Sequence, residues 1–276
     1  MTALLSITAG LIALIALLII YMRREASCAV LETIRLTTEE EGLRVVHLSD
    51  LHLKIGGVRL SAITSAVRDA APQIVVLTGD YIDSSKESDR FISWMGDLIG
   101  AVSDAAFYMC FGNHDRKAFT RSPSLMRELT KSMKRLGVYV VENRTLSFYH
   151  DDKLYAITGF SDYYASPFHN PQKAFKGTPK DARYHIGLSH NPDIALELNG
   201  PRPNLLLLGH FHGGQIWLPF HLEYACLRKE RLCKIGIRRG LHFYGGRFIY
   251  ISRGLGCVLF PLRLGSRPEI TLFILP

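Results

Sequence analysis

The chain has 276 residues, of which 47% are apolar and 21% are charged. This composition provides for a buried core and excludes wholesale disorder, and 23 glycines and 12 prolines without a short repeat exclude a collagen-like or linker-type chain. Lys and Arg number 33 against 25 Asp and Glu, and the difference is the formal charge of +8. The five cysteines form no Cys-x-x-Cys pair, so neither a disulfide framework nor a thiolate zinc site is expected.

The N-terminal segment is long and apolar enough to cross a membrane. No residue from Thr2 to Met22 is charged, and about 20 apolar residues make roughly 30 Å of helix, which matches a bilayer core. Arg23 and Arg24 follow this run, whereas a cleaved signal peptide has its basic residues before it. The positive-inside rule therefore favours an uncleaved single-pass anchor over residues 1–24, with the rest of the chain on the cytoplasmic side of the inner membrane.

After the anchor, residues 25–42 are expected to form a linker and a first strand region, and residues 43–276 a folded domain. In that domain, short apolar runs alternate with segments of helical periodicity. The patterns predict strands at 44–48, 74–77, 105–111, 184–188 and 205–208, and helices at 59–70, 90–99 and 123–136. Strands that alternate with helices indicate α/β architecture, in which the strand C-termini deliver residues to a shared crevice.

Each of these strands is followed by residues that can bind a metal ion. In chain order they are Asp50 and His52, Asp80, Asn113, His190, and then His210 and His212. Taken alone, each group has an equally simple structural explanation as a helix cap, a turn or a hydrogen-bonded histidine. Together, these O and N ligands without a thiolate suit Mn²⁺, Fe or Zn²⁺ and exceed what one tetrahedral ion needs. We therefore expect a dinuclear site with a bridging Asp, and two ions about 3.5–4 Å apart can clamp a phosphoryl group.

The order of these motifs resembles the calcineurin-like metallophosphoesterase superfamily over roughly residues 43–276. The resemblance is closer to a membrane-associated bacterial branch that includes the YaeI and YkuE phosphoesterases and the chlamydial-type UDP-2,3-diacylglucosamine pyrophosphatase. This narrower match rests on residues 111–116 (FGNHDR), 189–193 (SHNPD), 209–216 (GHFHGGQI) and 252–270. The resemblance implies two mixed β-sheets packed face to face and flanked by helices, a four-layer sandwich preceded by one transmembrane helix.

The same resemblance implies roles for single residues. One ion would be held by Asp50, His52, Asp80 and His212, and the other by Asp80, Asn113, His190 and His210, with Asp80 bridging. Both ions are expected to be Mn²⁺, with Fe or Zn²⁺ as alternatives. His114 would stabilise or protonate the leaving oxygen, and Asp115 would orient it through the opposite ring nitrogen. Asp83 and Arg116 would support these residues or contact the phosphate, although a helix cap and a surface charge explain them equally well.

The segment from 217 to 247 is both basic and aromatic. Its basic residues are Arg228, Lys229, Arg231, Lys234, Arg238, Arg239 and Arg247, and its aromatic residues include Trp217, Phe220, Tyr224, Phe243 and Tyr244. Trp and Tyr favour the bilayer interface, and each basic residue near an anionic leaflet contributes about 1 kcal/mol. We therefore expect the segment to lie against the membrane and to admit an acylated, phosphorylated substrate, with Arg228, Lys229 and Arg231 in contact with it. A solvated basic loop with core aromatics is the alternative.

Three functions are consistent with these features. The first is hydrolysis of a lipid-linked nucleotide sugar such as UDP-2,3-diacylglucosamine to UMP and lipid X, a step of lipid A biosynthesis. The second is a phosphodiesterase or phosphomonoesterase without lipid preference. The third, a non-catalytic basic membrane-bound module, is disfavoured because such a module has no need of a full set of metal ligands plus His114. No nucleic-acid partner is expected, since the sequence has no nucleic-acid-binding motif beyond its net charge.

Overall fold

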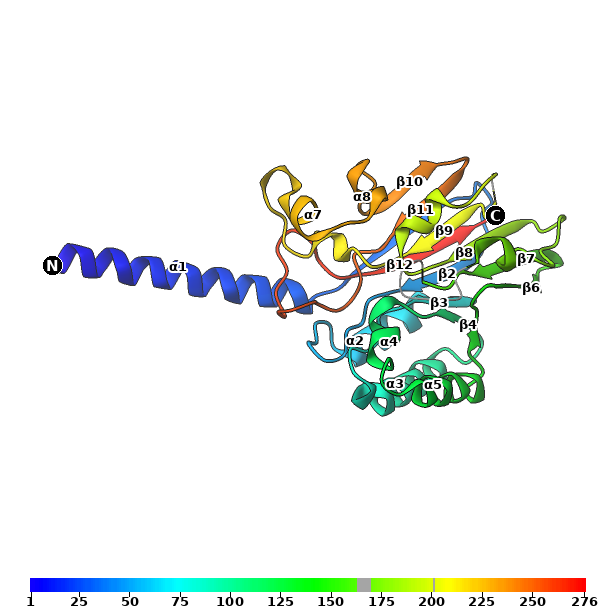
Figure 1. Cartoon of the computed structure of the whole chain (residues 1–276), viewed down its shortest axis with the longest axis horizontal. Coiled ribbons are helices and arrows are strands. Elements are labelled where there is room, and N and C mark those ends of the chain that lie inside the picture. The colour runs from blue at the N-terminus through cyan, green and yellow to red at the C-terminus, as the bar shows by residue number, and fades with distance from the viewer. Residues whose placement is uncertain (163–169, 201) are drawn as a thin grey trace.

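The computed structural model describes residues 1–162, 170–200 and 202–276. Helix α1 (Thr2–Ser27) projects away from the body that holds the other elements (Figure 1). Its apolar side chains are exposed, and among the described residues it is the helix that is long and apolar enough to cross a membrane. Its last turns touch the body, where Met22, Glu25 and Ala26 are buried.

The first sheet has six strands in the order β1-β12-β2-β3-β4-β5. Their bounds are Val30–Arg35 (β1), Leu43–Leu48 (β2), Ile74–Thr78 (β3), Ala106–Cys110 (β4), Tyr139–Val140 (β5) and Glu269–Leu275 (β12). Neighbouring strands are parallel except for β12 and β2, which are antiparallel. The strand nearest the C-terminus thus lies between the first two strands of the chain.

The second sheet also has six strands, in the order β10-β11-β9-β8-β7-β6. Their bounds are Arg144–His150 (β6), Lys153–Gly159 (β7), Tyr184–Leu188 (β8), Leu205–Leu208 (β9), Gly240–Tyr244 (β10) and Arg247–Ile251 (β11). The central strands are parallel, and a hairpin forms each edge. Both hairpins turn through two residues at positive φ, Asp151-Asp152 and Gly245-Gly246, which suits the twist of the strands.

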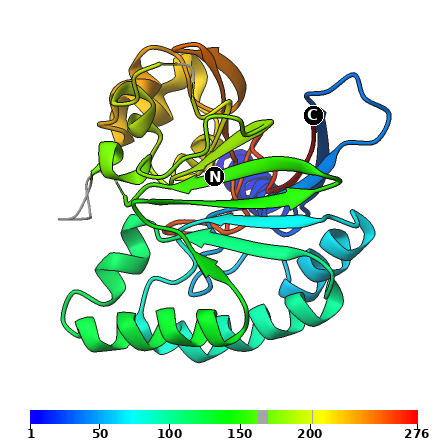
Figure 2. The ribbon, with the colours of Figure 1, turned by 90° about the vertical axis from the view of Figure 1, so that its right-hand side faces the viewer.

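Helices cover the outer face of each sheet, so that the body has four layers (Figure 2). The α-helices of the body are Leu60–Asp69 (α2), Ser88–Ala101 (α3), Asn113–Ala118 (α4), Pro123–Arg135 (α5), Pro171–Ala174 (α6), Leu222–Leu227 (α7) and Arg231–Lys234 (α8). Short 3₁₀ turns lie at Ser85–Glu87, Pro192–Leu196, His212–Gly214 and Pro219–His221. Helices α2, α3 and α5 pack on the first sheet, and α7 and α8 pack on the second.

The alternation of side chains along the strands builds a separate core on each face of a sheet. In β2, Val45 points into the layer between the sheets, whereas Val46 points to the helices. The layer between the sheets joins Val76 of the first sheet to Leu207 and Tyr250 of the second. The two sheets are therefore bound together by apolar contact, which fixes the positions of their ends relative to one another.

The expected two-sheet architecture and the N-terminal apolar helix are confirmed. The predicted strands and helices begin and end within one or two residues of β2, β3, β4, β8, β9, α2, α3 and α5. Strand β1 lies within residues 25–42, where a first strand region is expected, but the sequence patterns did not predict β5, β6, β7, β10, β11 or β12. Of these, β6 and β10 mix half-buried and exposed side chains and carry a weaker hydrophobic signal, whereas β12 is buried throughout, like the predicted β3 and β8.

Candidate metal centre

Strands of both sheets end at one cluster of carboxylates and imidazoles. In the first sheet, β2 is followed by Asp50 and β3 by Asp80; in the second, β8 is followed by His190 and β9 by His210. The carboxyl ends of parallel strands lie at the same edge of a sheet, and the face-to-face packing brings the two edges together. Each of these ligands lies two residues after the end of its strand, so the rigid strands determine where the side chains lie.

The backbone is strained at most of the predicted ligands. Positive φ angles occur at Asp50 (55°), His52 (42°), Asp80 (56°), His210 (75°) and His212 (51°). Residues with a Cβ rarely adopt this region, and each instance costs on the order of 1–3 kcal/mol. Strain of this kind persists where the surrounding structure enforces it, and its concentration at these residues indicates a functional site.

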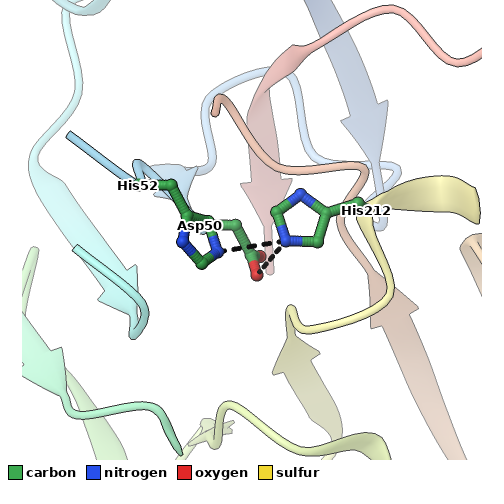
Figure 3. Close-up of side chains that lie close together, drawn as sticks. All are labelled: Asp50, His52 and His212. Atoms are coloured by element: carbon green, nitrogen blue, oxygen red, sulfur yellow. Dashed lines mark hydrogen bonds and ion pairs between the residues drawn. The ribbon is translucent and has the colours of Figure 1, made fainter. Parts of the chain in front are cut away.

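Asp50, His52 and His212 form one group, which we call the first half-site (Figure 3). His212 Nε2 lies 3.3 Å from Asp50 Oδ1 and 3.2 Å from His52 Nε2. His52 Nδ1 lies 3.0 Å from Asp83 Oδ1, which as a carboxylate accepts its proton. His52 Nε2 therefore keeps its lone pair, which points toward the centre of the group.

Asp80, His190 and His210 form the second half-site. His190 Nδ1 donates to the Thr78 carbonyl (2.8 Å), and His210 Nε2 donates to Glu230 Oε1 (2.7 Å). The other ring nitrogens, His190 Nε2 and His210 Nδ1, face each other at 3.2 Å, so a proton or a metal ion can lie between them. A bound metal ion would replace that proton, because both nitrogens would then present lone pairs to the ion.

Asp80 belongs to the second half-site and also reaches the first. Its Oδ2 atom is 3.6 Å from His52 Nε2 and 3.0 Å from His190 Nε2, while its Oδ1 atom accepts the backbone N–H of His114 at 2.8 Å. Burial alone would lower the pKa of His190, but the Asp80 carboxylate outweighs it and raises this pKa to about 10. The pocket thus favours positive charge next to Asp80, whether from a proton or from a metal ion.

The donor set fits divalent metal ions. Among the described residues, the side-chain oxygen Asn113 Oδ1 and the ring nitrogen His212 Nδ1 are buried without a hydrogen-bond partner. An unpaired buried polar atom costs about 1–3 kcal/mol, and a coordinated ion would remove that cost for Asn113. Imidazole nitrogen combined with carboxylate and amide oxygen, without thiolate, is a set that several first-row divalent metals accept.

His114 is paired with Asp83 and not with Asp115. His114 Nδ1 lies 2.7 Å from Asp83 Oδ1, and its side chain is 28% exposed. Asp115 is fully buried, and its carboxylate accepts backbone N–H groups at 2.8–3.1 Å from Asp80, Tyr81, Ile82 and Gly112. The predicted contact between Asp115 and His114 is therefore wrong. Asp115 instead fixes the loop that carries Asp80, because that loop presents several amide donors to one carboxylate.

The predicted substrate-binding residues lie in different environments. Asp83 contacts both His52 and His114, so it supports the site. Arg116 forms an ion pair with Glu142, and Arg231 forms one with Glu197 at 2.8 Å. The Lys229 side chain is exposed. The Arg228 guanidinium lies 5.5 Å from the ring centroid of Phe211, which places it beside the metal ligands on either side of Phe211.

Glu230 is a site residue that sequence reasoning missed. Its Oε1 atom accepts from His210, and its Oε2 atom accepts the backbone N–H of Lys229 at 3.0 Å. Burial alone would raise the pKa of Glu230, but the hydrogen bond from His210 outweighs it and lowers this pKa to about 2. The signal in the sequence is an acidic residue in a basic segment, and from the sequence alone this residue is interpreted only as a counter-charge to its basic neighbours.

Known proteins resemble this chain over most of its length. The model for the calcineurin-like phosphoesterase family matches residues 43–214. Phosphodiesterase YaeI of Escherichia coli is 31% identical over 83% of this chain and 80% of its own length, and UDP-2,3-diacylglucosamine pyrophosphatase LpxG of Chlamydia muridarum is 28% identical over 83% and 82%. A transmembrane protein with a metallophosphoesterase domain from Danio rerio is 30% identical over 85% of this chain and 53% of its own. The chain therefore belongs to the calcineurin-like phosphoesterase family and is a metal-dependent phosphoester hydrolase.

Proposed function

We propose that this hydrolase is a membrane-anchored enzyme with two divalent ions, Mn²⁺ being the first choice, and that it cleaves the diphosphate of UDP-2,3-diacylglucosamine to UMP and lipid X. The position of Asp80 Oδ2 between the half-sites is the observation that carries the dinuclear proposal. The likeness to a pyrophosphatase of that substrate supports the choice of bond. The basic segment next to the site supports a lipid-linked substrate.

Each group of residues at the site would have a separate role in the reaction. The first half-site with Asp80 would hold one ion, and the second half-site with Asn113 the other. Bound divalent ions would supply charge neutralisation at the phosphoryl group and activation of water. His114 would carry a proton on Nε2 and give it to the leaving oxygen.

Asp83 would support this proton transfer. Burial alone would raise the pKa of Asp83, but the hydrogen bonds from His114 and His52 outweigh it and hold this pKa below its usual range. The Asp83 carboxylate therefore stays ionised and accepts the Nδ1 proton of His114. It thereby fixes the ring so that Nε2 is the nitrogen that can act on the leaving oxygen.

A surface cavity that Arg228 lines is proposed to receive the substrate. It has a volume of about 240 Å³ and is lined by Phe220, His221, Tyr224, Ala225, Arg228, Cys233, Lys234 and Arg238. Arg228 extends from this cavity to Phe211, so it would bind phosphate while the aromatic wall receives the acylated part. Lys229 would add charge, whereas Arg231 is engaged with Glu197 and would contribute less.

The anchor is proposed to be single-pass in the inner membrane with the body in the cytoplasm. Arg23 and Arg24 at the end of α1 support this orientation. An epitope fused after Pro276 is then protected from protease in intact cells and is cleaved after lysis. Cleavage in intact cells would show that the body lies on the other side.

Product analysis with full-length protein, Mn²⁺ and UDP-2,3-diacylglucosamine in detergent tests the substrate. UMP release that vanishes in Asp80→Asn is the expected result, and Arg228→Glu is expected to slow this reaction without slowing hydrolysis of a soluble bis-aryl phosphodiester. Cleavage of the aryl ester alone would favour the second candidate, a phosphodiesterase without lipid preference, which the likeness to YaeI supports. A non-catalytic module would cleave neither substrate.

A further inference from the structure

Large apolar side chains are exposed on the side of the body from which α1 projects. Phe220 is 94% exposed in the segment before α7, and Leu259 (74%) and Phe260 (63%) are exposed in the loop between β11 and β12. In Figure 1 this loop runs beside the end of α1, and the segment with α7 lies on the same side of the body. Together with Trp217 and Leu218, which are partly exposed, these residues are called the apolar rim.

The backbone of the apolar rim is held in a costly conformation. Phe220 has a φ of 58° and Leu259 a φ of 65°. Bulky residues are genuine outliers in this region, and each also exposes most of its side chain to water. Backbone strain and the exposure of apolar surface both cost free energy at Phe220 and Leu259, which indicates that these exposed side chains have a function.

The two parts of the rim form one surface. The Gln215 side chain donates to the carbonyls of Val258 (2.9 Å) and Leu262 (3.2 Å) and accepts the backbone N–H of Val258 (2.8 Å). The backbone N–H of Trp217 donates to the Leu264 carbonyl at 2.9 Å. These bonds fix the β11–β12 loop against the segment that leads to α7.

The rim is also fixed relative to α1. The backbone N–H of Arg263 donates to the Met22 carbonyl at 3.1 Å, and the Met22 side chain is buried against the body. Arg23 and Arg24 follow Met22 at the point where the apolar part of α1 ends. The Arg239 guanidinium lies 3.5 Å from the ring centroid of Trp217, so positive charge accompanies the apolar side chains.

We infer that the apolar rim is a membrane-docking surface that inserts into the headgroup region of the anionic bilayer that holds α1. This inference rests on the proposed membrane anchoring. Apolar side chains accompanied by basic ones such as Arg239 match an anionic interface, where the rings and aliphatic chains enter the acyl boundary and the cations stay at the phosphates. Because Phe220 also lines the cavity proposed for the substrate, docking would hold that cavity at the height of the lipid headgroups.

Trp217 is a built-in probe for this inference, because the other tryptophan, Trp94, is buried in the core. Full-length protein is reconstituted into anionic vesicles whose lipids carry bromine near the headgroup end of the acyl chains. The bromine is expected to quench the Trp217 emission, and Trp217→Phe is expected to abolish the effect. The double variant Leu259→Asn/Phe260→Ser is expected to lose most of the quenching, since Asn tolerates the positive φ at 259 while both apolar side chains are removed.

Tyr149→Ser is the matched control, because this 73% exposed aromatic residue lies on β6, at the end of the body away from α1. Unchanged quenching in the control supports the inference. An unquenched wild-type Trp217, or full quenching in the double variant, overturns it; a rim covered by a protein partner or a second copy would give the first of these results.

Co-sedimentation with vesicles reports α1 anchoring separately. Hydrolysis of a soluble aryl phosphodiester by the double variant confirms that this variant is folded. Quenching does not depend on turnover, so an error in the proposed substrate would not change the quenching result.

Discussion

Three histidines of the metal centre use one ring nitrogen for a supporting hydrogen bond and keep the other for the centre. The supporting acceptors are Asp83 for His52, the Thr78 carbonyl for His190 and Glu230 for His210. Such acceptors fix the ring and raise the basicity of the coordinating nitrogen. Two of the three acceptors are acidic side chains, so their contribution to metal binding can be tested by mutation.

Glu230→Ala is expected to weaken metal binding at the second half-site by about 10–100-fold, because His210 loses its acceptor. Competition between the protein and a fluorescent chelator measures this without turnover. Glu197→Ala is the control, since it removes the same charge from a residue that pairs with Arg231 and does not contact the metal centre. Equal affinity in the two variants would show that Glu230 does not support His210.

His114→Asn is expected to lower turnover by about 10²–10⁴-fold for an alkyl leaving group, which needs a proton, and by much less for a nitrophenyl leaving group. Asp83→Asn is expected to show the same preference more weakly, because Asp83 acts through His114. The ratio of the two rates in each variant is the measurement. An equal loss for both leaving groups would contradict a proton donor at position 114.

At the level of elements, the loops after the strands pack so closely that glycine is required. A Cβ at Gly209, directly after β9, would lie 2.0 Å from Ser49 Oγ and 2.5 Å from Asp50 Oδ2. The loops of the two sheets thus meet at van der Waals contact, which is how strands from different sheets share one metal centre.

Gly209→Ala is expected to displace Asp50 and to reduce metal affinity at the first half-site together with the melting temperature. Gly100→Ala in α3 is the control, because its Cβ would meet no atom within 4 Å. Replacing a helical glycine by alanine is expected to stabilise the protein by about 0.5–1 kcal/mol. Differential scanning fluorimetry with and without metal distinguishes the two, and a metal-dependent melting temperature unchanged in Gly209→Ala would contradict the packing argument.

His47 joins neighbouring strands in the interior and makes stability depend on pH. Its Nε2 atom lies 2.7 Å from Thr78 Oγ1, and burial lowers its pKa to about 3. The unfolded chain, with a pKa near 6.5, therefore binds the proton that the folded chain refuses, so stability falls as the pH drops below about 6.5. Between about pH 7.5 and pH 5.5 this amounts to about 1.4 kcal/mol.

His47→Gln keeps a polar partner for Thr78 and cannot titrate. Its melting temperature is therefore expected to fall less than that of the wild type between about pH 7.5 and pH 5.5, by a few degrees. Measurement of both proteins in the same detergent with saturating metal cancels the contributions of the other groups. Identical pH dependence in the two proteins would show that His47 is not responsible.

At the scale of the whole molecule, α1 continues into the body through buried contacts at Met22, Glu25 and Ala26. The β11–β12 loop of the apolar rim, whose Arg263 N–H donates to the Met22 carbonyl, is therefore tied to the end of α1. The positive charge of the chain adds attraction to an anionic leaflet. This arrangement supports the proposal that one short chain combines an anchor, a phosphoester-cleaving centre and access to a lipid-linked substrate.

The sequence predicted β2, β3, β4, β8 and β9 because their signals are local, but it missed β7, β11 and the fully buried β12. Buried strands such as β3 and β8 are continuous apolar runs, and the ligands follow them directly. The partners of those ligands could not be predicted, because they depend on tertiary packing. Asp83 and not Asp115 contacts His114, although Asp115 is adjacent in the chain, and Glu230 reaches His210 from a separate segment. A contact of this kind leaves no periodic pattern in the sequence.

The central claim is that two divalent ions share Asp80. Its most direct test is a titration of Mn²⁺ into metal-free full-length protein, with bound metal and hydrolysis of a soluble bis-aryl phosphodiester measured on the same samples. Activity is expected to rise as the second ion binds and to reach its maximum at two ions per chain, and Asp80→Asn is expected to be inactive. Full activity with one ion per chain, or in Asp80→Asn, would contradict the account.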